Sequence, residues 1–231
     1  MKKNIILLMT AVFGVFVLAG CSEDDLNKTS AVLDSPTVEN DFDRWLAMNY
    51  MEPYNIDFKY RFKDVLGDMD YNLTPADYGQ AIKLAKLTLH LTLQVYDEVT
   101  GSRQFISENF PKIVHVIGSP AYNENNNIVL GVAEGGKMMN LYQVNIIDYL
   151  LNTKDIDQLN ELFFKTMHHE FGHILHQTRP YSTDFNAVTP SSYVGDACFD
   201  TYRTDAAARQ AGFITRYSSK APDEDFVEQL S

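Results

Sequence analysis

Apolar residues recur with a helical period in the stretch between Asp155 and Pro180. They follow one another at steps of four, four, four and three residues, at Leu159, Phe163, Met167, Phe171 and Ile174. This spacing lines one face of an α-helix. Asp155 with Gln158 three residues later is a start signal for such a helix, and Pro180 ends it. The pattern therefore predicts a helix with one buried face and one face free for polar side chains.

Shorter apolar patterns predict two earlier helices. The first is a short amphipathic helix that carries Phe42, Trp45, Leu46 and Met48. The second begins at Thr74-Pro75-Ala76-Asp77, with proline in its first turn, and runs to about Val99.

Strand patterns alternate with these helices. Residues 56–62 alternate apolar and polar side chains, as a half-buried strand does. Further strand candidates are 113–117, 128–133 and 138–144, the last two joined by a turn at Gly135-Gly136. Strands followed by a long helix predict an α+β fold, in which a small mixed sheet packs against that helix.

The N-terminus has the pattern of an export signal. Residues 1–20 combine two lysines with a short apolar run, which predicts a cleaved signal peptide rather than a membrane span. Leu18-Ala19-Gly20-Cys21 resembles the lipobox of bacterial lipoproteins, a resemblance that implies acylation of Cys21. The polar residues 21–38 are then a flexible tether, and 39–231 the folded domain. Cys198, left without a partner for a disulfide, is interpreted as a small buried hydrophobic residue.

Charge narrows the class of partner. The formal net charge is −12 at pH 7, and it becomes −14 once Lys2 and Lys3 leave with the signal. A surface of that sign repels nucleic acid and anionic lipid. The sequence also has no glycine-rich phosphate loop, so we expect neither a nucleotide nor a nucleic acid as partner.

The polar face of the predicted long helix carries an HExxH motif. His169 and His173 are four residues apart, so their imidazoles lie on one face and can bind one zinc ion. Glu170 lies beside them and can act as the base toward a water molecule. Gly172 costs roughly 1 kcal/mol against alanine in a helix interior, which predicts a close approach by another backbone. The motif indicates metal-assisted hydrolysis.

A hydrolytic zinc site needs a third protein ligand, and the sequence offers two kinds of candidate. The HExxHxxGxxH pattern is excluded because His176 and Arg179 stand at its glycine and last histidine positions. His176 is too far along the helix axis to share the ion comfortably, so we interpret it as lining the pocket or supporting a ligand. The later helix with Glu224 and Glu228 offers a ligand and a hydrogen-bond partner for a histidine ligand. His90 and His115 are interpreted as packing residues.

Together, residues 169–173 and 224–228 resemble gluzincin-type metallopeptidases, most of all the branch similar to anthrax lethal factor. That resemblance implies a zincin-like fold with Glu224 as the third zinc ligand and Glu228 behind a histidine ligand. It also implies that Tyr217, seven residues before Glu224, stabilises the oxyanion. Val227 stands where the branch has alanine.

Residues 52–56, 60–61 and 168–177, together with the lipobox, resemble the zinc metallopeptidase lipoproteins of Bacteroidetes that accompany outer-membrane nutrient importers. The resemblance implies one zinc ion per chain, a peptide or protein substrate and importer components as partners. It places the protein at the outer membrane by its lipid anchor, on the periplasmic or cell-surface side. Relatives run well beyond the glutamate helix, so the end at Ser231 is interpreted as a truncation.

Two other functions stay open on the sequence. One is a non-catalytic accessory lipoprotein with a structural or vestigial zinc site, although the intact Glu170 argues against it. The other is hydrolysis of a different amide, such as a cell-wall peptide. For a peptide substrate, the predicted strand 138–144 is the expected edge for pairing with an extended chain.

Overall fold

A four-stranded mixed sheet forms the centre of the computed structural model, which describes residues 39–67, 70–122, 128–188 and 192–231. Residues Glu39–Ser231 form one compact unit. The predicted signal peptide, the tether and Cys21 lie outside the described residues. No helix among the described residues has the length and apolar character needed to cross a membrane.

Three parallel strands and one antiparallel strand make up this sheet, in the order β1-β2-β6-β5. The strands are β1 (Asp57–Lys59), β2 (Ile113–Val116), β6 (Met138–Leu141) and the antiparallel β5 (Gly131–Glu134). Gly135 and Gly136 join β5 to β6 with positive φ angles of 54° and 70°, which glycine adopts at little cost. A separate two-stranded sheet pairs β3 (Ala121–Tyr122) with β4 (Ile128–Val129). The predicted α+β class and the mixed sheet are confirmed.

The prediction that residues 138–144 form an edge strand is wrong. β6 lies between β2 and β5, and it ends at Leu141, before the 3₁₀ turn η4 (Val144–Ile146). β5 pairs with β6 on the side away from β2, so among the described strands β5 forms this edge of the sheet. Met139, Asn140 and Leu141 are all fully buried, as expected of a strand with neighbours on both sides.

The first helical segment comprises α2 (Asp41–Leu46), the π-helical turn η1 (Ala47–Met51) and α3 (Glu52–Tyr54). A capping box starts it: the Asn40 side chain accepts from the Asp43 N–H, and the Asp43 carboxylate accepts from the Asn40 N–H. Arg61 donates two hydrogen bonds to the same carboxylate, each of 2.7 Å. Phe42 and Leu46 are buried as predicted, whereas Met48 is 60% exposed and does not belong to the buried face.

The second helical segment comprises α4 (Tyr78–Thr88), the π-helical turn η3 (Leu89–Leu93) and α5 (Gln94–Thr100), and α6 (Gln104–Asn109) follows. Asp77 caps α4 by accepting from the N–H groups of Gly79 and Gln80. Pro75 therefore precedes the helix instead of standing in its first turn, which corrects the predicted start. It forms an isolated bridge with Ile117, and a Cβ on Gly118 would lie 2.1 Å from the Pro75 carbonyl oxygen.

The third helical segment carries the HExxH motif. After α7 (Ile147–Thr153), a continuous helical rod comprises α8 (Ile156–Leu159), the π-helical turn η5 (Asn160–Lys165) and α9 (Thr166–Thr178). Asp155 caps its start, as predicted, by accepting from the Gln158 N–H at 3.1 Å. All five residues of the predicted apolar stripe are buried. The rod therefore packs one face inward and leaves the histidine face toward the C-terminal segment.

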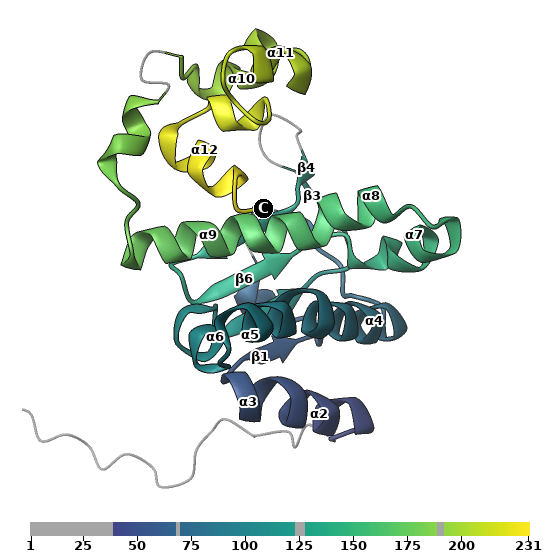
Figure 1. Ribbon diagram of the computed structural model, residues 1–231. Coiled ribbons are helices and arrows are strands. Elements are labelled where there is room, and N and C mark those ends of the chain that lie inside the picture. Colours follow the sequence, from purple (N-terminus) through teal and green to yellow (C-terminus); the bar gives the residue numbers. More distant parts are fainter. Residues whose placement is uncertain (1–38, 68–69, 123–127, 189–191) are drawn as a thin grey trace, which may run out of the picture. The chain divides into compact units, whose positions relative to one another are not determined.

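That C-terminal segment is a set of short helices. They are η6 (Thr183–Ala187), η7 (Gly195–Ala197), α10 (Cys198–Thr201), α11 (Asp205–Gln210), η8 (Tyr217–Ser219) and α12 (Pro222–Glu228). Figure 1 shows α12 on one side of α9 and the sheet strand β6 on the other. α12 packs directly on α9. Cys198 is buried, as predicted.

Gly172 is the residue that lets α12 approach α9. A Cβ at this position would lie 3.0 Å from Cγ1 and 3.1 Å from Cβ of Val227. The close neighbour is thus a side chain of α12, whereas the sequence predicts a backbone. This tight contact explains why a glycine, and no larger residue, stands in the interior of the helix.

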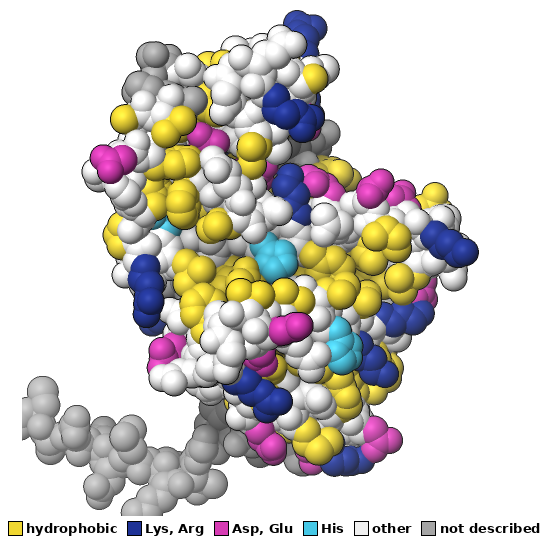
Figure 2. Space-filling view, viewed as in Figure 1, with side chains coloured by type: hydrophobic (Ala, Val, Ile, Leu, Met, Phe, Trp, Pro, Cys, Tyr) yellow, Lys and Arg dark blue, Asp and Glu magenta, His cyan; other side chains and the backbone are white. Residues whose placement is uncertain are grey.

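The surface carries both signs of charge despite the net negative balance. On the face shown in Figure 2, hydrophobic side chains gather along the middle of the molecule, level with α9, and acidic and basic side chains are scattered around them. Acidic residues form no single patch on this face.

Candidate metal centre

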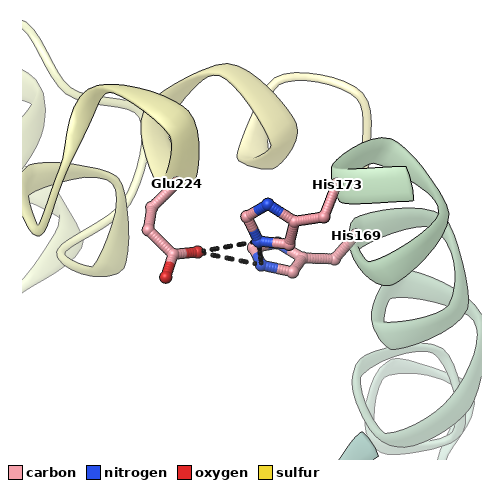
Figure 3. A group of neighbouring side chains, drawn as sticks. All are labelled: His169, His173 and Glu224. Atoms are coloured by element: carbon pink, nitrogen blue, oxygen red, sulfur yellow. Dashed lines mark hydrogen bonds and ion pairs between the residues drawn. The ribbon is translucent and has the colours of Figure 1, made fainter. Parts of the chain in front are cut away.

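Three donor atoms from two helices converge on one point. Nε2 of His169 lies 3.1 Å from Nε2 of His173, and Oε2 of Glu224 lies 3.1 Å from the first and 3.2 Å from the second. Figure 3 shows the Glu224 carboxylate pointing from α12 toward the two imidazoles of α9. Among the described residues these three form the group of His, Cys, Asp and Glu side chains placed to share a metal ion.

The local sequence explains this convergence. His169 and His173 are one helical turn apart on α9, so their rings lie on one face, edge to face at 4.8 Å. Glu224 is in the first turn of α12, which begins with Pro222 after the extended Ala221. The contact of Val227 with Gly172 sets α12 close to α9. The two helices therefore meet with their donors facing each other.

The donor set and its spacing fit zinc. Two imidazole nitrogens and one carboxylate oxygen are zinc ligands, and three protein ligands with an open fourth position are typical of hydrolytic sites. Donors held at 2.0–2.1 Å by one tetrahedral zinc ion lie roughly 3.3 Å apart. The three separations of 3.1, 3.1 and 3.2 Å are close to that value.

The second oxygen of Glu224 has partners of its own. Oε1 accepts from the Tyr217 hydroxyl at 2.9 Å and from the Lys220 ammonium at 3.0 Å. Burial acts to raise the pKa of Glu224, but hydrogen bonds from His169, His173, Lys220 and Tyr217 outweigh it and hold the pKa well below its usual range. Glu224 is therefore a carboxylate at any pH near neutrality.

Glu228 supports His169 from the other edge of the ring. Its Oε1 lies 3.2 Å from Nδ1 of His169, and its Oε2 accepts from the Thr215 hydroxyl at 2.7 Å. Lys165 lies 3.5 Å from Oε2. Burial opposes the charge, yet the contacts with His169 and Thr215 lower the pKa of Glu228. A charged carboxylate on Nδ1 fixes the ring orientation and leaves Nε2 facing Glu224.

Glu170 takes no part in the triangle of donors, and its carboxylate is bonded to the sheet. Its Oε2 accepts from the backbone N–H of Ala133 on β5 at 3.2 Å. Burial raises the pKa of Glu170, and the neighbouring His169 and His173 oppose that rise. A carboxyl group of raised pKa beside a metal site is a candidate base.

One family profile, described as "Putative zinc-binding metallo-peptidase", matches residues 35–231. The chain belongs to this family. No curated protein matches. A crystal structure of a protein from Bacteroides caccae with the same description superposes on this one with a TM-score of 0.66. The two sequences are 38% identical, and the match spans 81% of this chain and 69% of the other. The predicted zincin-like α+β fold is therefore confirmed, and so is the general family of zinc-binding metallopeptidases.

The remaining histidines of the chain do not belong to the group of three donors. His176 stacks on Tyr181 at 4.4 Å, within an aromatic cluster that includes Phe185 and Phe226. Its predicted role in lining the pocket or supporting a ligand stays a prediction. The buried His115 bonds to Asn140, which fits the predicted packing role, whereas His90 is exposed and contacts Gln94. His168 contacts the Tyr96 hydroxyl at 2.9 Å.

Three supporting residues are not indicated by any motif in the sequence. Lys220 contacts Glu224, Thr215 contacts Glu228, and the Ala133 N–H contacts Glu170. Lys220 and Thr215 precede α12, and the extended backbone of Ala221 breaks any helical spacing between them and the glutamates. The position of Ala133 depends on the strand order. The spacing of Lys220, three residues after Tyr217 and four before Glu224, is the one sequence signal for its contacts with both residues.

Proposed function

We propose that the protein is a zinc-dependent peptidase in which His169, His173 and Glu224 bind one zinc ion. The observation that carries the proposal is the triangle of donor atoms with sides of 3.1, 3.1 and 3.2 Å. Glu170 directly follows the first histidine and takes no part in that triangle. The site therefore combines three metal ligands with a separate carboxylate.

The chemistry divides between the ion and the chain. Zinc bound there would lower the pKa of a water ligand to about 7 and polarise a substrate carbonyl. Glu170 accepts a proton from the attacking water and passes it to the leaving amine. The Ala133 N–H holds one oxygen of Glu170 and so limits the directions in which its carboxylate can turn. Tyr217 supplies a hydroxyl for the developing oxyanion, since it already lies against Glu224.

An extended peptide is the substrate class that the fold suits. β5 is an edge strand of the sheet and packs against α9. Its Ala133 N–H donates a hydrogen bond to Glu170, the proposed base of the HExxH motif. A peptide that pairs with the edge of β5 would run past Glu170. This assignment replaces the pairing along residues 138–144 that the sequence suggested.

A non-catalytic accessory module is the rival function. A purely structural zinc site is closed by four protein ligands and needs no base. The described residues offer three donors in one group, and Glu170 lies beside them with a raised pKa. Both observations favour the enzyme.

A peptide-library digest tests the proposed activity. The purified protein is incubated with a library of mixed peptides, with and without a chelator, and the products are identified by mass spectrometry. We expect cleavage at internal peptide bonds that stops with the chelator and returns with added zinc. Full zinc occupancy without cleavage of any peptide would favour the accessory module or a hydrolase of another amide.

We also propose that the protein is a lipoprotein of the outer membrane, acylated at Cys21, that works beside a nutrient importer. The lipobox-like residues 18–21 and the resemblance to importer-associated lipoproteins support this location. Cys21→Ala should abolish labelling by a radioactive fatty acid and release the protein from membranes. A variant that is still acylated and membrane-bound would refute the anchor.

A further inference from the structure

Lys220 connects Glu224 and Tyr217, two of the side chains that the C-terminal segment contributes to the metal centre. Its ammonium donates to Oε1 of Glu224 at 3.0 Å and to the hydroxyl oxygen of Tyr217 at 3.2 Å. The Tyr217 hydroxyl donates to the same Oε1 at 2.9 Å. The three groups form a closed triangle of hydrogen bonds, and the ammonium also lies 5.0 Å from the centre of the tyrosine ring.

The two oxygens of Glu224 are divided between two sets of partners. Oε2 faces the imidazoles of His169 and His173, whereas Oε1 accepts hydrogen bonds from Lys220 and Tyr217. The Glu224 side chain is 12% exposed, so both oxygens depend on protein partners for their hydrogen bonds. With Oε1 held by Lys220, Oε2 is the oxygen left to bind a metal ion.

The count of hydrogens distinguishes the two donors. A phenol has one hydrogen, whereas an ammonium group has three. When Tyr217 turns its hydrogen toward a substrate oxygen, it must leave Oε1 of Glu224. Lys220 still donates to Oε1, so the carboxylate keeps a partner and its orientation. Lys220 also occupies a lone pair of the Tyr217 oxygen, which directs the hydroxyl hydrogen away from the lysine.

We propose that Lys220 is a positioning residue of the metal centre, which holds Glu224 as a one-oxygen ligand and orients the Tyr217 hydroxyl. This inference rests on the proposed function. Removal of Lys220 takes one of the two donors from Oε1, so that a lone pair of this oxygen can approach the ion and close the open position. The Tyr217 hydroxyl stays bonded to the other lone pair, because it is then the last donor to Oε1.

Cobalt substitution tests the first half of the proposal without a substrate. Co²⁺ binds the same nitrogen and oxygen ligands as zinc, and its visible bands weaken as the coordination number rises. We expect Lys220→Met to have weaker bands than the wild type, because Glu224 binds through two oxygens. Lys220→Arg retains donors to Oε1 and should restore the bands. The matched control is Lys83→Met. It removes a lysine that pairs with Asp148 and lies outside the group of three donors.

Kinetics test the second half, on a peptide selected from the library digest. We expect Lys220→Met to lower kcat about 10- to 100-fold, the usual effect of losing a residue that orients a ligand, with KM unchanged. If Lys220 acts partly through the hydroxyl, the same substitution should cost less in the Tyr217→Phe background. Thermal unfolding of each variant verifies that it is folded, and Lys220→Leu serves if the methionine variant is not.

The outcomes separate this inference from the proposed function. A wild-type protein that binds neither zinc nor cobalt would refute the metal centre itself. Wild-type binding with an unchanged cobalt spectrum in Lys220→Met would overturn the role of Lys220 toward Glu224. An equal loss of kcat with and without the Tyr217 hydroxyl would overturn its role toward Tyr217. In either of these last two cases the proposed peptidase activity stands.

Discussion

Oε1 of Glu228 lies 3.2 Å from Nδ1 of His169, on the opposite edge of the imidazole from Glu224. The Glu228 side chain is 4% exposed and its pKa is lowered, so a buried carboxylate faces the ring. It accepts the Nδ1 hydrogen and thereby leaves the Nε2 lone pair for a metal ion. The two glutamates of α12, one turn apart, therefore have different tasks on the same histidine.

This division predicts different losses for the two glutamates. Glu224→Ala removes a donor of the triangle, so the purified variant should retain almost no zinc. Glu228→Ala removes an orienting contact, so zinc should stay bound with an affinity about 10- to 100-fold lower. Zinc per chain, measured by mass spectrometry on both variants side by side, decides the assignment. The reverse result would exchange the two roles, and full zinc in both would move the third ligand elsewhere, with His176 the first residue to examine.

Tyr217→Phe should lower turnover and leave zinc affinity unchanged. The hydroxyl contacts the carboxylate oxygen of Glu224 that faces away from the triangle, so its loss leaves the three donors in place. Its proposed contribution falls on the transition state, and we expect kcat to drop about 100-fold, as for one donor to an oxyanion. Phe199, which stacks on Tyr217 at 6.2 Å, provides a control, since Phe199→Leu keeps the hydroxyl. Normal turnover in Tyr217→Phe would make the tyrosine a packing residue.

Asp43→Asn should destabilise the fold in a way that depends on pH. Burial opposes the charge of Asp43, but the hydrogen bonds from Arg61, Asn40 and Tyr60 lower its pKa to about 2. A folded pKa below the ordinary 3.8 stabilises the fold above pH 4, and the contribution is lost as the pH falls toward 2.

We therefore expect Asp43→Asn to lower the free energy of unfolding by about 1–2 kcal/mol at pH 7, less than the full shift because Arg61 is partly exposed. The difference from the wild type should shrink between pH 4 and pH 2. Urea unfolding at several pH values measures both quantities. Asp41→Asn, which alters an exposed ion pair with Arg44, is the control and should have no measurable effect. A pH-independent difference would rule out the charge of Asp43 as its cause.

The sequence predicted the elements that depend on local periodicity. The stripe from Leu159 to Ile174 is buried as expected, because a regular rod carries both this stripe and the HExxH face. The spacing of His169 and His173 fixed their relative positions for the same reason. The convergence of Glu224 with them required the resemblance to known peptidases, since no local pattern says which helix packs on α9.

The order of the strands was beyond the reach of these patterns. Alternation along a strand indicates which side chains share a face, but it does not say which strands are neighbours. The pattern therefore places residues 138–144 at an edge, although Met138–Leu141 form the interior strand β6. Their nearly continuous apolar run was a signal of an interior parallel strand. The N–H of Ala133 reaches Glu170 only because β5 lies outside β6, and so it could not be predicted either.

The central claim is that Glu170 acts as the base at a zinc site built from other residues. Its carboxylate bonds to Ala133, and the three donor atoms lie within 3.2 Å of one another without it. Replacement by glutamine keeps the size of the side chain and removes its capacity to accept a proton. The variant should therefore bind zinc as the wild type does and lose hydrolysis.

Glu170→Gln tests this claim most directly, through zinc content and peptide hydrolysis measured on the same purified sample. We predict one zinc ion per chain and a rate at least ~100-fold below the wild type, the usual cost of removing a general base. A zinc-loaded Glu170→Gln protein that cleaves peptides at the wild-type rate would contradict the account.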